Sequence, residues 1–246
     1  MFQQMKRTMA KTILHKAATR GHAAHGWLDS HHSFSFAGYY NPDRMSFGAL
    51  RVLNDDIVAG GRGFDTHPHD NMEIISIPLE GDLEHKDNLG NKIIIKQGDI
   101  QVMSTGTGVF HSEYNANPDR PAKFLQIWVF PNQLNVQPRY DQITPDLTQK
   151  NQLHQVLSPY PDDAGTWIYQ AAWFNLGRFD KDFATTYHIQ KPGNGVYAFV
   201  IKGRFDINGQ ELAARDGFGI WDTDSISLTA LESDAEILLM DVPLKP

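Results

Sequence analysis

The stretch IISIPLEGDLEHKDNLGNKIIIKQGDIQVMS, residues 74–104, indicates the fold class of this 246-residue chain. It alternates short apolar runs with Gly, Asp and Asn, and the segment DNLGN at 87–91 is typical of a hairpin because Gly90 tolerates a positive φ. Similar short runs separated by turn residues extend from residue 46 to residue 130, with little helical periodicity. This pattern predicts an all-β sandwich or barrel.

The pattern occurs a second time later in the chain. The stretch YAFVIKGRFDINGQELAARDGFGIWD, residues 197–222, again has an apolar strand, a glycine, a hairpin and a turn into another strand. Residues 131–167 lie between the two copies, carry five prolines and little periodicity, and resemble a domain linker, with room for a short helix. Repetition on this scale predicts a duplicated barrel. We place the first domain at residues 11–140 and the second at residues 141–246.

Composition excludes several classes of function. The formal net charge of −7 argues against a sequence-independent nucleic-acid binder, which needs a basic surface. No apolar run approaches the roughly 18 residues of a membrane span, and the start, MFQQMKRTMAKTIL, lacks the apolar stretch of a secretory signal. We therefore expect a cytoplasmic protein with an irregular leader, in which Met5 and Met9 leave a later translation start open. Because the chain has no cysteine, any metal must use nitrogen or oxygen ligands.

Two pairs of residues have the spacing of metal ligands on strands. His67 and His69, in DTHPHDNMEII, stand at i and i+2 and project from the same face of a strand. Pro68 between them places the pair at a strand end, an edge or a bulge. His111 and Glu113, in TGTGVFHSEYN, repeat the spacing. On neighbouring strands the two pairs would bring three imidazoles and one carboxylate to a single ion and leave coordination positions open.

A rival carboxylate, Glu73, follows the first pair. On a straight strand it would lie about 13 Å from His69, too far to share an ion, but a turn at residues 70–72 would remove that objection. Spacing alone therefore leaves Glu73 and Glu113 as alternatives. His85 could line the same cavity, although ligation by it is less favoured because it breaks the i, i+2 pairing.

The remaining histidines have simpler interpretations. The chain has eleven, and a lone histidine is usually a surface or hydrogen-bonded structural residue. His31 and His32 are sequence neighbours that face opposite sides of a strand, and we interpret both as structural. His22 and His25 lie in the loop-like segment GHAAHG, which favours solvent or backbone contacts. The second repeat has no HxH, so we expect one working site per chain.

Two longer patterns resemble the two motifs of the cupin superfamily. They are Gly61-x5-His67-x-His69-x3-Glu73 followed by Gly81, and Gly98-x7-Gly106-x-Gly108-x2-His111-x3-Asn115. One extra residue before Gly81, and Gly106 in the place of the usual proline, depart from the cupin pattern in the way that pirins do. Together with GWLDSHHSFSFAGYYNP (26–42), LRVLNDD (50–56) and the degenerate second copy, these motifs resemble the pirin family, particularly its bacterial members, from about Lys11 to the end.

The resemblance implies an all-β bicupin, with two β-barrels of the jelly-roll type and one metal in the N-terminal barrel. It implies that the ligands are His67, His69, His111 and Glu113, and it gives Glu73 a supporting or barrel-lining place. Such a donor set suits Fe(II) first, and also Mn, Co, Ni, Cu or Zn, because imidazole and carboxylate are not very selective.

Several pirins are similar to flavonol 2,4-dioxygenases, which open the central ring of quercetin and release carbon monoxide. We therefore expect an enzyme that acts on a flavonol-like molecule and O2 without an organic cofactor. Glu113 would be the base that takes the proton of the flavonol 3-hydroxyl. Apolar residues near the motifs could line a flat pocket, although core packing is the favoured role of each. They are Phe34, Phe36, Met72, Met103, Phe110 and Trp128.

Two alternatives belong to other classes. The first is a metal-binding regulatory protein that contacts protein partners, as pirin does with transcription factors, and in which turnover is incidental. The second is sugar isomerisation, as in other cupins. It fits less well because no basic cluster for a phosphate surrounds the HxH.

Overall fold

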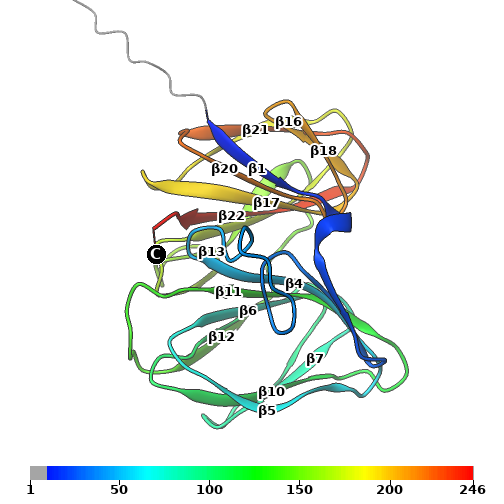
Figure 1. Cartoon of the computed structure of the whole chain (residues 1–246), viewed down its shortest axis with the longest axis vertical. Coiled ribbons are helices and arrows are strands. Elements are labelled where there is room, and N and C mark those ends of the chain that lie inside the picture. Colours follow the sequence, from blue (N-terminus) through cyan, green and yellow to red (C-terminus); the bar gives the residue numbers. More distant parts are fainter. Residues whose placement is uncertain (1–9, 246) are drawn as a thin grey trace, which may run out of the picture.

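A computed structural model describes residues 10–245, which form two stacked β-sandwich halves (Figure 1). The one helical element in this range is a short 3-10 turn, η1 (Ala17–Thr19). No helix within residues 10–245 is long and apolar enough to cross a membrane. The expectation of an irregular leader concerns residues 1–9 and lies outside the described residues.

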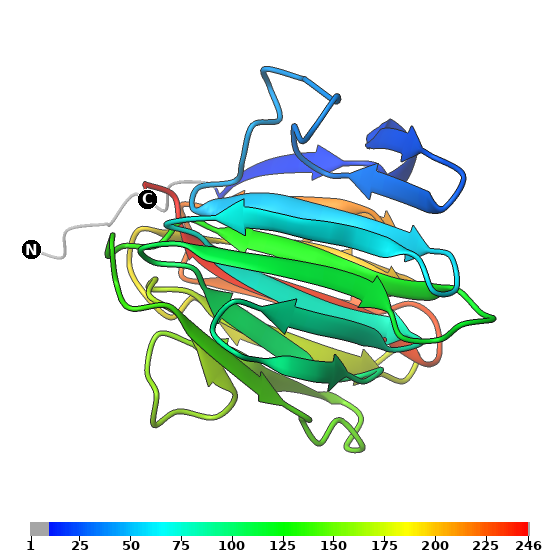
Figure 2. The same ribbon diagram turned by 90° about the horizontal axis from the view of Figure 1, so that it is seen from below.

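The first half packs a seven-stranded sheet against a four-stranded sheet. The large sheet has the order β12-β9-β6-β11-β4-β3-β2 and the small sheet the order β5-β10-β7-β8. The strands of the large sheet are β2 (Gly21–Ala24), β3 (Leu28–His32), β4 (Leu50–Val58), β6 (Glu73–Glu80), β9 (Ile100–Ser104), β11 (Ala122–Val129) and β12 (Arg139–Ile143). Those of the small sheet are β5 (Gly63–His69), β7 (Leu83–Asp87), β8 (Lys92–Ile95) and β10 (Val109–Asn115). Figure 2 shows the hairpin β2–β3 at the edge of the large sheet, beside β4.

The second half repeats this plan. Its large sheet has the order β1-β20-β17-β22-β15-β13-β14 and its small sheet the order β16-β21-β18-β19. The strands of the large sheet are β1 (Lys11–His15), β13 (Gln152–Ser158), β14 (Thr166–Trp167), β15 (Trp173–Phe179), β17 (Asn194–Lys202), β20 (Gly217–Trp221) and β22 (Ala235–Pro243). Those of the small sheet are β16 (Ala184–His188), β18 (Arg204–Ile207), β19 (Gln210–Ala213) and β21 (Ser225–Ala230). The predicted all-β duplication is confirmed.

Each half receives one strand from the other. β1 precedes all strands of the first half in the chain, yet it pairs with β20 of the second half (Figure 1). β12 follows the first half and pairs with β9, at the corresponding edge of the first large sheet. The predicted division at residues 140 and 141 therefore falls inside β12. The domain bounds 11–140 and 141–246 remain a proposal, because β1 pairs across this division and β12 straddles it.

The structure corrects the prediction that residues 131–167 form a domain linker. This segment contains three strands, β12, β13 and β14, and no residue of the segment is helical. The side chains of β12 are all half-buried because the strand lies at a sheet edge. An edge strand of this kind lacks the apolar alternation that would have revealed it.

The largest core lies between the two seven-stranded sheets and joins the halves. It includes Leu50, Ile75, Leu125, Phe174, Tyr197 and Leu238. β6 contributes alternate side chains to the two sides of its sheet. Ile75 and Ile77 enter this core, whereas Ile74 and Ser76 face the interior of the first barrel.

The interiors of the two barrels differ in character. Sixteen buried apolar residues fill the second, among them Phe205, Phe218 and Leu228. The first has two smaller apolar clusters, one that includes Phe124 and one that includes Met103. β21 holds the place in its small sheet that β10 holds in the first, and it buries apolar residues where β10 carries His111 and Glu113. The described chain therefore has one polar barrel interior.

Candidate metal centre

Three histidines meet on the small sheet of the first half. β5 and β10 are antiparallel, and His67 stands directly opposite His111, with His69 opposite Val109. The ring centroids of the three histidines are 4.5 to 5.0 Å apart, and one nitrogen of each lies within 4.8 Å of the others. The i, i+2 spacing in HPH therefore brings both its histidines to His111.

The protonation and hydrogen bonding of these rings suit metal binding. His67 Nδ1 donates to the carbonyl oxygen of Asp65 at 2.6 Å, which leaves Nε2 with its lone pair. Burial, together with neighbouring histidines, lowers the pKa of His69 to about 4 and that of His111 to about 3. Both imidazoles are therefore neutral, the form that binds a metal.

His111 supplies the strongest evidence that the residues fit a metal ion. The side chain is 2% exposed, and neither ring nitrogen has a hydrogen-bond partner anywhere in residues 10–245. A buried polar group without a partner is costly and needs an explanation. An ion held by His67, His69 and His111 would give one of the two ring nitrogens of His111 a partner, and a set of imidazoles suits a divalent transition metal.

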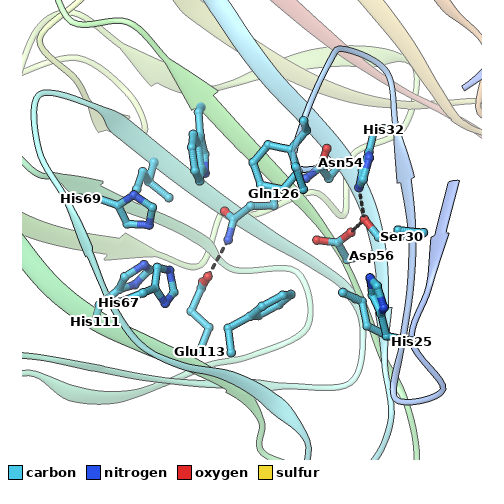
Figure 3. A pocket seen from close by; sticks show the side chains of 17 residues that line it. His25, Ser30, His32, Asn54, Asp56, His67, His69, His111, Glu113 and Gln126 are labelled. Carbon is cyan, nitrogen blue, oxygen red and sulfur yellow. Dashed lines mark hydrogen bonds between the residues drawn. The ribbon is translucent and has the colours of Figure 1, made fainter. Parts of the chain in front are cut away.

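Glu113 lines the same cavity, outside the group of three imidazoles. Its carboxylate accepts a hydrogen bond from Gln126 Nε2 at 2.5 Å (Figure 3). It also accepts one from Ser76 Oγ at 2.8 Å. Opposite this part of β10, the partner strand β5 has one extra residue, so His111 stands opposite His67 whereas Glu113 stands opposite Phe64. Glu113 is thus held by β6 and β11 beside the histidines, and its ligation remains a prediction.

Comparison with known proteins identifies the family. The sequence model described as Pirin matches residues 14–129, and that of the quercetinase C-terminal cupin domain matches residues 155–242. A protein named quercetin 2,3-dioxygenase from Escherichia coli K12 is 45% identical, with 94% of this chain and 98% of the relative covered. The chain belongs to the pirin family. A pirin-like protein from Caulobacter vibrioides is 42% identical over 90% of this chain and 95% of its own length.

Solved structures of pirins share the fold. The crystal structure of YhhW from Escherichia coli has a TM-score of 0.91 and 44% identity, and 95% of this chain and 98% of that chain are covered. The complex of YhhW with nickel(II) has a TM-score of 0.89 and 43% identity, covering 95% of this chain and 99% of that chain. The predicted pirin membership and bicupin fold are confirmed.

The prediction gave Glu73 a supporting or barrel-lining place, and the structure leaves Glu73 out of the residues that line the cavity. A turn does occupy residues 70–72, with Asn71 at a φ of 46°, but Glu73 points out of the barrel, toward the other half. It is 1% exposed, accepts a hydrogen bond from Ser104 Oγ at 2.7 Å and lies near Arg139. Burial raises the pKa of its carboxyl group to about 7. The alternation of β6 sends Ile74, not Glu73, into the cavity.

His85 packs behind the cavity and is not among its lining residues. Its Nε2 atom contacts Asp87 Oδ2 at 2.9 Å, and its ring lies 5.4 Å from that of His111, centroid to centroid. The suggestion that His85 lines the cavity is therefore wrong, although it contacts a residue that does.

The cavity extends well beyond the three histidines, with a volume of about 180 Å³. Its walls come from both sheets of the first half, and Figure 3 shows the histidine cluster at one side and a polar group from β3 and β4 at the other. That polar group consists of Ser30, His32, Asn54 and Asp56, with His25 nearby.

Sequence reasoning missed this second polar wall. His32 and His25 line the cavity, although we interpreted the first as structural and the second as a loop residue. The available signal was the same one that located HPH: Ser30 and His32 stand at i and i+2, as do Asn54 and Asp56 in an otherwise apolar strand. Burial raises the pKa of Asp56 to about 7 and lowers that of His32 to about 4.

The other residues that the sequence singled out lie in several different places. Phe36 and Trp128 line the cavity, with ring centroids 5.3 Å apart, whereas Phe34 is in the core between the halves. Met103 and Met72 pack in or against a small cluster of the first barrel, and Phe110 is exposed. His31 faces away from His32, as expected, and stacks on His22 across β2 and β3, where both contact Asp29.

Proposed function

We propose that this protein is a metal-dependent dioxygenase that opens the central ring of a flavonol, the reaction of a quercetin 2,4-dioxygenase, with uptake of O2 and release of carbon monoxide. The observation that carries the proposal is the buried, unpartnered His111 beside His67 and His69, at the end of a cavity with an aromatic wall. The similarity to proteins named quercetin 2,3-dioxygenase supports the substrate class.

We assign the ligand set as His67, His69, His111 and Glu113, with Fe(II) as the first choice of metal. When bound, the ion would supply Lewis acidity toward a substrate hydroxyl and redox chemistry toward dioxygen. The hydrogen bond from His67 to the Asp65 carbonyl holds that ring with Nε2 free. Nickel is a close second, because a pirin has been crystallised with nickel(II).

Glu113 has the geometry of a general base. Its carboxylate faces the cavity, and the Ser76 hydroxyl and the Gln126 amide fix its orientation. In the proposed reaction it takes the proton of the flavonol 3-hydroxyl and so leaves an electron-rich flavonolate. Phe36 and Trp128 offer ring edges and faces to a planar substrate and exclude water from it.

The proposal is tested by giving quercetin and O2 to protein reconstituted separately with Fe(II), Ni(II), Mn(II), Co(II), Cu(II) and Zn(II). We expect oxygen consumption and carbon monoxide release in equal amounts with at least one of these ions. His67→Ala and Glu113→Ala should abolish both. Glu73→Gln is the matched control, because Glu73 lies outside the cavity, and it should retain activity.

Two results would contradict the proposal. Oxygen uptake that persists in His67→Ala would show that the three-histidine site is not the catalytic one. Fully metal-loaded protein that never consumes a flavonol would favour the regulatory alternative, with a protein partner in place of a substrate.

A further inference from the structure

Four polar side chains form a compact group on the wall of the cavity across from the histidine cluster. Ser30 stands directly opposite Asp56, and His32 directly opposite Asn54, on the neighbouring strands β3 and β4. All four line the cavity and are at most 3% exposed. Two adjacent cross-strand pairs on one face therefore bury four polar groups at one place.

The hydrogen bonds inside this group have a defined direction. When Asp56 is ionised, the Ser30 hydroxyl donates its proton to Asp56 Oδ1, so it accepts from His32 Nε2, which lies 2.8 Å away (Figure 3). His32 is neutral and carries its proton on Nε2, which leaves Nδ1 as an acceptor. The orientation of the His32 ring is thus set by Ser30 and Asp56.

Two acceptor atoms of the group have no donor. Neither His32 Nδ1 nor Asn54 Oδ1 has a hydrogen-bond partner among the residues that the structure describes. Both belong to side chains that line the cavity and are 2% exposed. Buried acceptors of this kind are expected to be satisfied by a bound molecule that brings its own N–H or O–H donors.

The lining between the two polar walls is largely apolar. It consists of Leu28, Phe36, Phe64 and Trp128, together with Gln126, whose amide is held by Glu113. Trp27 packs edge-on against Phe64. A ligand that fills this space has a flat apolar middle and polar groups at both ends. The second barrel offers no comparable space within the described chain, because its interior is filled with apolar side chains.

We propose that Asn54 and His32, the latter held by Ser30 and Asp56, form a subsite that recognises hydroxyl groups on the part of a planar aromatic substrate remote from the metal-binding end. This inference rests on the proposed function and extends it, because it makes the enzyme selective for polyhydroxylated flavonols. A flavonol with hydroxyls on its outer rings donates to both free acceptors. One hydroxylated only at position 3 leaves them unpaired, and a site built to bond a hydroxyl rejects such an analogue.

The test compares two ligands in the absence of oxygen. Quercetin carries outer-ring hydroxyls and 3-hydroxyflavone has none, so the ratio of their dissociation constants isolates the subsite. Nickel-loaded protein is titrated anaerobically with each, and the absorption of the bound flavonol is followed. We expect the wild-type protein to bind quercetin at least fivefold more tightly, and Asn54→Leu to bring the ratio close to one.

Two further variants make the comparison specific. Ser30→Ala removes the acceptor that orients His32 and should also reduce the ratio of the two dissociation constants. It provides an independent test of the subsite if Asn54→Leu folds poorly. Asn175→Leu is the matched control: Asn175 is a buried asparagine on β15, which occupies in the second half the position of β4. It should leave the ratio and the nickel content unchanged.

The outcomes separate the subsite from the reaction. An unchanged ratio in both Asn54→Leu and Ser30→Ala, or a wild-type ratio near one, overturns the subsite even if the protein is a dioxygenase. A wild-type preference that both variants remove, in protein that consumes no oxygen when air is admitted, upholds the subsite and overturns the proposed reaction. Absence of saturable binding of either flavonol overturns both.

Discussion

His67 and His111 stand directly opposite each other on the antiparallel strands β5 and β10, with ring centroids 4.5 Å apart. Cross-strand partners of this kind share one face of the sheet, so the pairing of two strands places nitrogen ligands at one point without a dedicated loop. Because β5 also carries His69 two residues further along, a single hairpin-like pairing supplies three imidazoles.

The metal content should depend on this pairing. In equilibrium dialysis with nickel, wild-type protein should bind one ion tightly per chain, and His67→Ala should lose that ion because only two imidazoles remain. His31→Ala serves as the control, since His31 belongs to a separate, partly exposed group with His22 and Asp29. Loss of the tight ion in His31→Ala, but not in His67→Ala, would place the metal at the wrong group for the proposed function.

His111 should destabilise the metal-free protein and stabilise the metal-loaded one. His111→Leu removes a buried imidazole without hydrogen-bond partners in residues 10–245, so the free energy of unfolding of metal-free protein should rise by about 1 kcal/mol. With saturating nickel the order should reverse, because only the wild type gains binding energy. Urea denaturation with and without nickel measures both values. The same order in both conditions would argue against His111 as a ligand.

The hydrogen bond from Gln126 to Glu113 should matter for turnover more than for metal content. Gln126→Leu releases one carboxylate oxygen, and we expect kcat with quercetin to fall about tenfold or more while nickel still binds through the histidines. Gln101→Leu is the control, at a buried glutamine of β9, which β6 separates from the strand of Gln126, and its amide has no partner among the described residues. Equal losses in the two variants would point to a general packing effect.

Glu73 should make the stability of the protein depend on pH. Its folded-state pKa, about 7, lies above the ordinary value of 4.5, so the folded protein holds the proton more tightly. Its contribution is therefore complete below pH 4.5 and is lost as the pH rises to about 7, by about 3 kcal/mol. Glu73→Gln should flatten that part of the profile. Denaturation at a series of pH values measures it, and because Asp56 titrates in the same window in both proteins, their difference isolates Glu73. Profiles that stay parallel would contradict this role.

Local alternation was enough to predict part of the site. The spacing of His67, His69 and His111 depends only on the period of a strand, and the structure brings all three together. The repeated glycine and hairpin pattern likewise predicted the duplication, because each turn is a local event.

The positions that depend on distant packing could not be predicted in this way. The direction of Glu73 follows from which face of β6 meets the other half, which the preceding residues do not determine. The polar wall was accessible in principle, since Asn54 and Asp56 repeat the i, i+2 signal, but only the pairing of β3 with β4 shows that His32 joins them. The pairing of β1 with β20 joins residues about two hundred positions apart, and no local sequence pattern predicts it.

The exchange of β1 and β12 between the two halves also limits when each large sheet can be completed during synthesis. The ribosome must pass Ile143 before the large sheet of the first half has its edge strand β12, and β1, among the first segments made, waits for β20 near the end. Released alone, either half would expose a bare sheet edge that invites association with other chains. β1 and β12 thus tie the two large sheets together, which gives the apolar second barrel a structural role beside the barrel that carries the histidine cluster.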